Sequence, residues 1–247
     1  MKISIITSVY NNKETIEDAI KSVLSQSYEN IEYILVDGGS SDGTLDIIQK
    51  YKDKIDTFIS EPDRGIYDGL NKGVGLATGD VVAFLHSDDL YASNTIIEDI
   101  VNEFETTGAD GVYGDLIYTP KEDTSKVLRY WKSKDFKPSM LAQGWMPAHP
   151  TFFLKKSVYD TYGKFDLSFK IAGDYDFMLR VLSAGIKVSY LPKVFYKMRV
   201  GGESNKSIKN IILKSKEDLR ALKNNNIGGL RTLFIKNISK VKQFLRK

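Results

Sequence analysis

The 247-residue chain contains no cysteine. Disulfide bonds and thiolate metal sites are therefore excluded, and a reducing compartment suits such a chain. No apolar run approaches the ~20 residues that a membrane-spanning helix needs. No basic, signal-like segment precedes the strand-like residues 3–10. We expect a cytoplasmic protein that is not integral to a membrane.

Two glycine motifs that hold phosphate groups are also missing. No G-x-G-x-x-G follows the first predicted strand, and the series Gly73, Gly75 and Gly79 comes after a predicted helix with a different spacing. The sequence has no P-loop either. Dinucleotide-binding Rossmann proteins and P-loop proteins need these glycines beside the phosphates, so both classes are disfavoured.

Charge is unevenly distributed along the chain. Residues 1–205 carry 23 basic and 30 acidic side chains, a net charge of −7, whereas residues 206–247 carry 12 basic and 2 acidic side chains, a net charge of +10. We expect a globular body over residues 1–205 and a basic helical extension over residues 206–247. Such an extension indicates an anionic partner, most often a lipid surface or a nucleic acid.

Strand and helix patterns alternate four times in roughly the first 90 residues. Strands are predicted at residues 3–9, 32–37, 57–60 and from residue 81 onward, with helices at 14–26, 44–51 and 68–76 between them. This alternation is typical of an α/β fold, in which helices flank a mostly parallel sheet through right-handed crossovers.

The fourth of these strands leads into the most informative polar cluster. An apolar run from Val81 ends in His86, Ser87, Asp88 and Asp89. Open α/β sheets bind ligands at the carboxyl ends of their strands. Carboxylates there suit a hard cation, Mg2+ or Mn2+, that grips a diphosphate. Alternatively, Asp88 caps a helix that starts near Tyr91.

The first two strands end in residues that suit a nucleotide base. Tyr10 offers a flat face for stacking, and the Asp37 carboxylate can accept a ring N–H. The alternative is that Asp37, Gly38 and Gly39 only form a turn.

Six segments in this order resemble the inverting family 2 glycosyltransferases, which have the GT-A fold and include bacterial enzymes of capsule, O-antigen and exopolysaccharide assembly. The segments are Ser4–Asn11, Ser22–Tyr28, Val36–Thr44, Glu61–Gly73, Ala77–Asp80 and Phe84–Asp89. They cover residues 3–90 almost continuously. The resemblance implies that residues 1–205 form a GT-A catalytic domain.

Several donor-site roles follow from this resemblance. Asp37 hydrogen-bonds the base, Val9 and Tyr10 hold the nucleoside, and Arg64 meets the diphosphate. Residues 86–88 occupy the family's D-x-D position, with Ser87 at the nucleotide and Asp88 as the metal ligand. His86 replaces the usual first Asp, and the resemblance assigns it no role.

The second half of the chain supplies the remaining candidates. Residues 121–145 have little periodicity and are expected to be irregular. His149 is either a contact to the donor sugar or the acceptor, or a histidine satisfied within a loop. The resemblance aligns Asp174 with the general base, although the same residue also suits a helix cap. Arg199, before a Gly-Gly pair expected to be mobile, either closes on the diphosphate or is a surface arginine.

The resemblance implies a metal-dependent enzyme that moves a sugar from a nucleotide-sugar donor, most commonly a UDP-sugar, to a hydroxyl of a glycan or lipid-linked acceptor in bacterial surface polysaccharide synthesis. Because the displacement is single and inverting, one carboxylate acting as base is sufficient. Two alternatives remain: a nucleotide-sugar pyrophosphorylase, although no glycine-rich loop follows Tyr10, and a non-catalytic nucleotide- or carbohydrate-binding module.

Residues 230–247 have the pattern of a basic amphipathic helix, with one apolar face and one cationic face. We expect it to lie on an anionic membrane surface, which would make the protein peripheral to the inner face of the cell membrane. Alternatively, its apolar stripe packs on the catalytic domain or on a partner subunit. The aromatic spacing argues against nucleic acid. The predicted apolar positions are Leu230, Leu233, Phe234, Ile238, Val241, Phe244 and Leu245, and the predicted cationic ones are Arg231, Lys236, Lys240, Lys242, Arg246 and Lys247.

Overall fold

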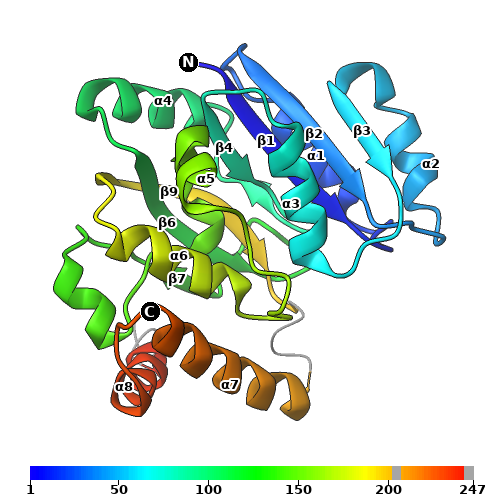
Figure 1. The fold of residues 1–247 in the computed structure, drawn as a ribbon. Coiled ribbons are helices and arrows are strands. Elements are labelled where there is room, and N and C mark those ends of the chain that lie inside the picture. The colour runs from blue at the N-terminus through cyan, green and yellow to red at the C-terminus, as the bar shows by residue number, and fades with distance from the viewer. Residues whose placement is uncertain (202–206, 242–247) are drawn as a thin grey trace.

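Four parallel strands from the first third of the chain build one half of the sheet. A computed structural model describes residues 1–201 and 207–241 and shows these strands in the order β3-β2-β1-β4 (Figure 1). Val9 at the end of β1 is in register with Asp37 at the end of β2. Their bounds are Ile3–Val9 (β1), Ile31–Asp37 (β2), Thr57–Ser60 (β3) and Val81–Phe84 (β4).

The other half of the sheet is mixed, and continues from β4 in the order β8-β6-β9-β5. Strand β8 is antiparallel to both β4 and β6, whereas β6 and β9 are parallel. A short strand β7 extends the edge of β6. The bounds are Leu90–Tyr91 (β5), Gly111–Thr119 (β6), Arg129–Trp131 (β7), Phe153–Lys155 (β8) and Val188–Arg199 (β9).

Helices cover both faces of the sheet, as alternation along β1 requires. Ile3 and Ile5 pack with α1, α2 and α4, whereas Ile6 packs on the opposite face with α3, α5 and α6. Figure 1 shows α3, α5 and α6 in front of the sheet. The bounds are Ile16–Leu24 (α1), Thr44–Gln49 (α2), Ile66–Leu76 (α3), Ile96–Thr107 (α4), Lys156–Tyr162 (α5) and Gly173–Ser183 (α6), with short 3-10 helices at Lys52–Lys54 (η1), Pro138–Gln143 (η2) and His149–Thr151 (η3).

Helix α3 lies unusually close to β1 because of a glycine. A Cβ atom on Gly73 would sit 2.3 Å from Cγ2 of Ile6. A glycine inside a helix lowers the stability of the helix by about 1 kcal/mol relative to alanine. The close packing of α3 on β1 offsets this loss. This packing places Tyr67, in the first turn of α3, at the functional site.

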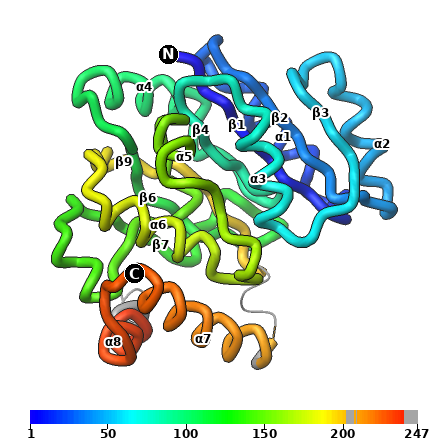
Figure 2. Tube along the Cα trace, viewed as in Figure 1, coloured from blue at the N-terminus to red at the C-terminus, as the bar shows by residue number. Residues whose placement is uncertain are grey.

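Two helices, α7 (Ile208–Asn224) and α8 (Leu230–Val241), complete the described chain. Ala221 and Leu222 of α7 belong to the same buried cluster as α6. Figures 1 and 2 show α7 and α8 together at the end of the molecule away from β1, β2 and β3. Across residues 1–201 and 207–241, none of the helices is long and apolar enough to cross a membrane.

The region after β4 differs from the sequence prediction in one respect. No helix starts near Tyr91, because Leu90 and Tyr91 pair with β9 and the next helix begins at Ile96. The alternative role of Asp88 as a helix cap is therefore wrong. The Gly-Gly pair expected to be mobile starts at Gly201, and its second glycine lies outside the described residues.

Candidate active site

The Asp37 carboxylate is held rigidly at the end of β2. Its Oδ2 accepts hydrogen bonds from the N–H groups of Gly39 (3.1 Å) and Ser40 (3.0 Å) and from the hydroxyl of Ser60 (2.7 Å). Its Oδ1 is buried and has no hydrogen-bond partner in the part of the chain that the structure describes. The residue thus forms a turn and also keeps one acceptor oxygen for an incoming N–H group.

Tyr10 follows β1 at the same edge of the sheet. Its side chain is 66% exposed, while Val9 before it is buried and its carbonyl accepts the Gly38 N–H (2.8 Å). The next residue, Asn11, has a φ of 46° and accepts a hydrogen bond from the Ser41 N–H (2.9 Å). The loop after β1 is therefore tied to the loop after β2 and leaves the Tyr10 ring available for stacking.

Asp88 lies beside these loops. The Asn12 side chain donates to the Ser87 hydroxyl (2.9 Å), and the Thr15 hydroxyl donates to the Ser87 carbonyl (3.0 Å). Asp88 itself is half-buried. None of the hydrogen bonds or ion pairs among the described residues engages its carboxylate. Both oxygens are accordingly available to a cation.

Arg199, at the end of β9, holds the backbone of this segment. Its guanidinium donates to the Asp88 carbonyl (3.0 Å) and the Lys121 carbonyl (3.0 Å), and it pairs with the Asp18 carboxylate (2.6 Å). Its own backbone N–H donates to the buried carboxylate of Asp89 (3.1 Å). Burial, and then the adjacent Asp88 charge, raise the pKa of Asp89 well above its usual range.

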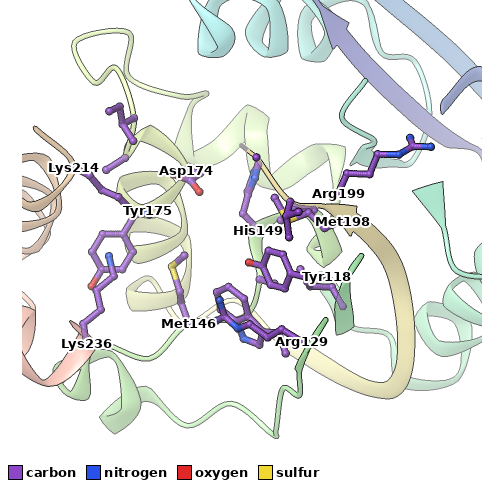
Figure 3. Close-up of a pocket in the computed structure, with 18 of the residues that line it drawn as sticks. Tyr118, Arg129, Met146, His149, Asp174, Tyr175, Met198, Arg199, Lys214 and Lys236 are labelled. Atoms are coloured by element: carbon purple, nitrogen blue, oxygen red, sulfur yellow. The ribbon is translucent and has the colours of Figure 1, made fainter. Parts of the chain in front are cut away.

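The sequence-based placement of Arg199 on a mobile or surface segment is therefore wrong. Arg199 is 7% exposed and belongs to a strand. Its guanidinium donates to three protein acceptors, which hold it against the Asp88 segment. Arg199 also lines the cavity described below, and Figure 3 shows its guanidinium pointing away from the other labelled side chains.

The other predicted diphosphate residue, Arg64, is exposed just before α3. It pairs with Asp68 (3.2 Å), and the strong exposure of its side chain leaves this pair weak. Its contact with a diphosphate stays a prediction. The neighbouring Lys72 is engaged by Asp63 (2.5 Å) and Glu61 (2.9 Å).

Asp174 lies in the first turn of α6 and lines a cavity of about 610 Å³. The N-cap of α6 is Ala172, so the alternative role of Asp174 as the cap is wrong. The Tyr67 hydroxyl lies 3.1 Å from Asp174 Oδ1 and 2.7 Å from the Ile171 carbonyl. Burial, and then the Asp174 charge, raise the pKa of Tyr67 well above its usual range, so Tyr67 stays protonated beside the carboxylate.

Asp176, two residues further along α6, has a separate role. Its carboxylate pairs with Arg180 (3.1 Å) and accepts from the Asn225 amide (3.0 Å). It is buried against α7 and is not among the cavity-lining residues. Asp176 therefore binds Arg180 and Asn225 and does not face the cavity that Asp174 lines.

Glu217 of α7 supports the segment that carries Asp174, and the sequence pattern did not identify it. Its carboxylate accepts the consecutive N–H groups of Lys170 (2.9 Å), Ile171 (2.8 Å) and Ala172 (2.9 Å). Glu217 is buried. The only signal in the sequence was that Glu217 and Asp218 are the two acidic residues among the basic residues 206–247. The α7 helix therefore takes part in building the site.

His149, in η3, lies between the cavity and the end of β4. Its ring stacks on Phe84 at a centroid distance of 5.6 Å and lies 6.3 Å from the His86 ring. Burial lowers the pKa of His149 to about 4, against the raising effect of the nearby Asp174 charge. Both histidines of the chain thus meet at this point, and His149 is neutral at physiological pH.

The remaining cavity wall is largely aromatic and apolar. Figure 3 shows Asp174 and His149 facing the same cavity as Tyr118, Met146 and Met198. Trp131 and Leu128 also line it, and Lys214 contributes a cation from α7. Asp37 and Asp88 do not line this cavity. The site therefore has two parts, a polar sheet edge and a separate cavity, which adjoin at His86 and His149.

The chain is similar to known glycosyltransferases. The family model described as "Glycosyl transferase family 2" matches residues 4–163. The chain is 31% identical over 225 residues to the Escherichia coli protein named UDP-Glc:alpha-D-GlcNAc-diphosphoundecaprenol beta-1,3-glucosyltransferase WfaP, covering 86% of this chain and 84% of that protein. It is 30% identical over 184 residues to a PGL/p-HBAD biosynthesis glycosyltransferase of Mycobacterium bovis, covering 73% of this chain and 69% of that protein.

Solved structures confirm the fold. The chain matches a fragment of TarS from S. aureus in complex with UDP-GlcNAc with a TM-score of 0.71 and 19% identity, over 91% of this chain and 65% of the fragment. It matches the mannosyltransferase PcManGT from Pyrobaculum calidifontis in complex with GDP-Man and Mn2+ with a TM-score of 0.70 and 18% identity, over 99% of this chain and 73% of that chain. The predicted GT-A architecture is therefore confirmed.

Proposed function

The chain belongs to glycosyl transferase family 2, and on that premise we propose that it transfers a sugar from a UDP-sugar to an acceptor hydroxyl with inversion at the anomeric carbon. One observation carries this proposal: Asp174 lines a cavity that is separate from the Asp37 and Asp88 edge but adjoins it at His149. Such an arrangement allows a donor and an acceptor to meet from opposite sides, as a single displacement requires.

The donor nucleotide is proposed to bind at the polar sheet edge. The buried Oδ1 of Asp37 is free to accept the ring N–H of uracil, and the exposed Tyr10 ring can stack on the base. A guanine ring N–H would also suit a carboxylate. Uridine is preferred because the name of the E. coli relative, which is 31% identical, includes UDP-Glc.

The residues present also suit a divalent cation, Mn2+ or Mg2+, at Asp88. No group of three or more His, Asp or Glu side chains that could hold a metal occurs among the described residues. One available carboxylate is nevertheless enough, because Mg2+ commonly binds one or two carboxylates together with substrate phosphates and water. When bound, such a cation would stabilise the charge of the leaving diphosphate.

The acceptor is proposed to occupy the cavity, with Asp174 as general base. The acceptor oxygen bonds to the anomeric carbon while the bond from that carbon to the diphosphate oxygen breaks, and the hydroxyl proton passes to the Asp174 carboxylate. Tyr67 and the segment held by Glu217 orient this carboxylate. Neutral His149 presents a ring nitrogen to the same space without adding positive charge beside the base.

The aromatic and apolar wall indicates the class of acceptor. Trp131 and Tyr118 offer flat faces of the kind on which sugar rings pack, and Met146 and Met198 add adaptable apolar surface. The name of the E. coli relative specifies a lipid diphosphate-linked sugar as acceptor. We therefore propose a glycan or lipid-linked saccharide acceptor in bacterial surface polysaccharide synthesis.

A donor and acceptor panel tests this proposal. The enzyme is incubated with Mn2+ or Mg2+, with UDP-Glc, UDP-GlcNAc, GDP-Man or a dTDP-sugar, and with N-acetylglucosamine linked through diphosphate to a short lipid. We expect transfer from a UDP-sugar, and a β-linked product from the α-linked donor by NMR. Transfer from GDP-Man alone would overturn the assignment of the base. An α-linked product would overturn the single displacement.

A further inference from the structure

Helix α8 packs on the rest of the chain through a face that carries Thr232, Leu233 and Lys236. The Thr232 hydroxyl donates to the Ala142 carbonyl (3.0 Å), and the Lys236 ammonium pairs with Asp218 of α7 (2.7 Å). The same ammonium lies 3.2 Å from the centroid of the Tyr175 ring. Lys236 is only 3% exposed. The sequence pattern placed Lys236 on the cationic face of this helix, and the structure shows that this part of the face is buried.

A glycine permits this close packing. A Cβ atom on Gly144 would lie 2.5 Å from the Cβ of Lys236, and Gly144 has a φ of 70° that favours glycine. Burying a lysine is costly unless the charge is paired. Here the Asp218 carboxylate and the Tyr175 ring supply partners, so the face of α8 that carries Lys236 packs on α6 and α7.

The opposite face of α8 presents an apolar row to solvent. Leu230, Phe234 and Ile238 follow one another at intervals of four residues and are 71%, 65% and 48% exposed. Residues spaced in this way lie along one side of a helix. Arg231 and Asn237 are exposed beside them. We call Leu230, Phe234 and Ile238 the apolar row.

A surface helix usually buries its apolar stripe, whereas α8 packs Leu233 against the core and leaves the apolar row exposed. Contiguous exposed apolar side chains mark a surface that contacts another molecule. The packing alternative predicted from the sequence is thus right in part, because Leu233 of the predicted apolar face packs against the core but the apolar row does not. Lys242, Phe244, Leu245, Arg246 and Lys247 of the predicted amphipathic helix lie outside the described residues, as do the side chains of Lys240 and Val241.

The positive charge around the apolar row indicates which kind of molecule contacts it. Residues 206–247 carry a net charge of +10, and Lys209, Lys216 and Lys223 are exposed on α7 next to the exposed Ile212. Apolar side chains among exposed cations match the interface of an anionic bilayer, where the apolar groups enter the headgroup boundary and the cations meet the lipid phosphates. We propose that α8 docks on an anionic lipid bilayer through the apolar row.

If α8 binds a bilayer in this way, the acceptor can be placed as well, an inference that rests on the proposed function. Lys236, on the inward face of α8, lines the same cavity as Asp174. The helix therefore separates the cavity from the surface that would contact lipid by no more than its own width, which is on the order of 10 Å. A saccharide carried on a lipid would then reach the proposed general base, Asp174, while its lipid stays in the bilayer.

Vesicle sedimentation of the full chain tests the surface. We expect binding to vesicles that contain phosphatidylglycerol, little binding to pure phosphatidylcholine, and weaker binding as salt rises from about 0.05 M to about 0.5 M. Leu230→Gln combined with Phe234→Gln should lower the partition coefficient by about tenfold or more. Ile238→Gln alone should give a smaller loss, and serves as the test if the double variant does not fold.

The matched control replaces two exposed apolar residues elsewhere, Leu24→Gln combined with Val127→Gln, and should partition within about twofold of the wild type. Point variants are preferred to removal of α8, because removal would leave Asp218 buried without Lys236. Wild-type protein that ignores anionic vesicles at low salt would overturn the proposal. So would equal binding by the double variant.

Two further measurements separate the alternatives. If the apolar row joins two copies of the chain, light scattering will show a dimer that the double variant abolishes, without lipid binding, and the proposal fails. Transfer to a water-soluble acceptor should be unchanged in the double variant. Lipid binding without any transfer activity would sink the proposed function and leave the docking surface standing.

Discussion

The guanidinium of Arg199 donates to the backbone carbonyl of Asp88 over 3.0 Å, across 111 residues of sequence. The bond joins the end of β9 to the segment that presents the proposed metal ligand. Arg199 is buried, and its guanidinium also donates to the Asp18 carboxylate and to the Lys121 carbonyl. We therefore regard Arg199 as a positioning residue for Asp88.

Arg199→Lys should lower the free energy of unfolding by about 2 kcal/mol, because an ammonium cannot reproduce the forked geometry that reaches three acceptors. Metal activation of transfer should weaken as well, with a higher Mn2+ concentration at half-maximal rate. The matched variant Asp18→Asn removes one partner, and the double variant should be less destabilised than the sum of the two. A wild-type melting temperature and metal response in Arg199→Lys would contradict this role.

Asp88→Asn should abolish transfer and the stabilisation of the protein by Mn2+ in the presence of UDP, because an amide oxygen is a much weaker ligand for a hard cation than a carboxylate. The fold should persist, since the Asp88 carboxylate makes no hydrogen bond within the described residues. Thermal melting with and without Mn2+ and UDP provides the measurement. The exposed Asp46→Asn on α2 serves as control. Near-normal turnover in Asp88→Asn would remove Asp88 as the metal ligand.

Asp174→Asn should reduce the rate of transfer by about 100-fold or more, as expected when a general base is lost. Donor binding should change little, because Asp174 lines the cavity and not the Asp37 edge. Comparison of kcat with the Kd for UDP separates the two effects. Asp176→Asn is a useful contrast, since its lost pair with Arg180 should lower stability more than rate. A variant of Asp174 that loses UDP binding would place this residue in the donor site.

His149 predicts a specific dependence of stability on pH. Burial depresses its pKa to about 4, below the ordinary value of 6.5 that applies to the unfolded chain. Between these two values the unfolded state binds the proton more strongly, so folding stability falls as the pH drops. Between pH 7 and pH 5 the loss should be about 2 kcal/mol.

Denaturant unfolding of His149→Gln should show a flatter pH dependence over this range, even if the variant is less stable at pH 7 because it loses the stacking on Phe84. The exposed Asp46→Asn on α2 serves as control for this measurement. Equal slopes in the wild type and in His149→Gln would show that His149 is not the group responsible.

Glu217→Gln should slow transfer and lower the melting temperature, because one amide group cannot accept all three N–H groups that the carboxylate now holds. The cost should be about 1–3 kcal/mol, the range for leaving a buried donor unsatisfied. The Kd for UDP should stay close to the wild-type value, which a general loss of folded protein would not produce. The exposed Glu29→Gln is the control, and an unchanged kcat in Glu217→Gln would argue against the role in positioning Asp174.

Much of the polar sheet edge was predictable from the amino-acid sequence alone. Each parallel strand of β1, β2 and β4 is a short apolar run, and the polar residues that end it must appear at the same edge of the sheet. Val9, Tyr10, Asp37, Ser87 and Asp88 therefore fall where their spacing predicted. The order of the motifs was also sufficient to identify the family. Each motif combines a strand end with a turn, and both are local properties of the sequence.

The contacts that complete the site depend on the tertiary structure. The sequence pattern shows only that certain residues are charged, and by that pattern they would be exposed to solvent. These residues are Arg199, Glu217 and Lys236. Each is buried because its partners, Asp18, the N–H groups of residues 170–172, and Asp218 with Tyr175, come from distant or separate elements. A buried charge is stable only where such partners converge. For that reason only the packed structure decided which face of α8 docks and which is left to solvent.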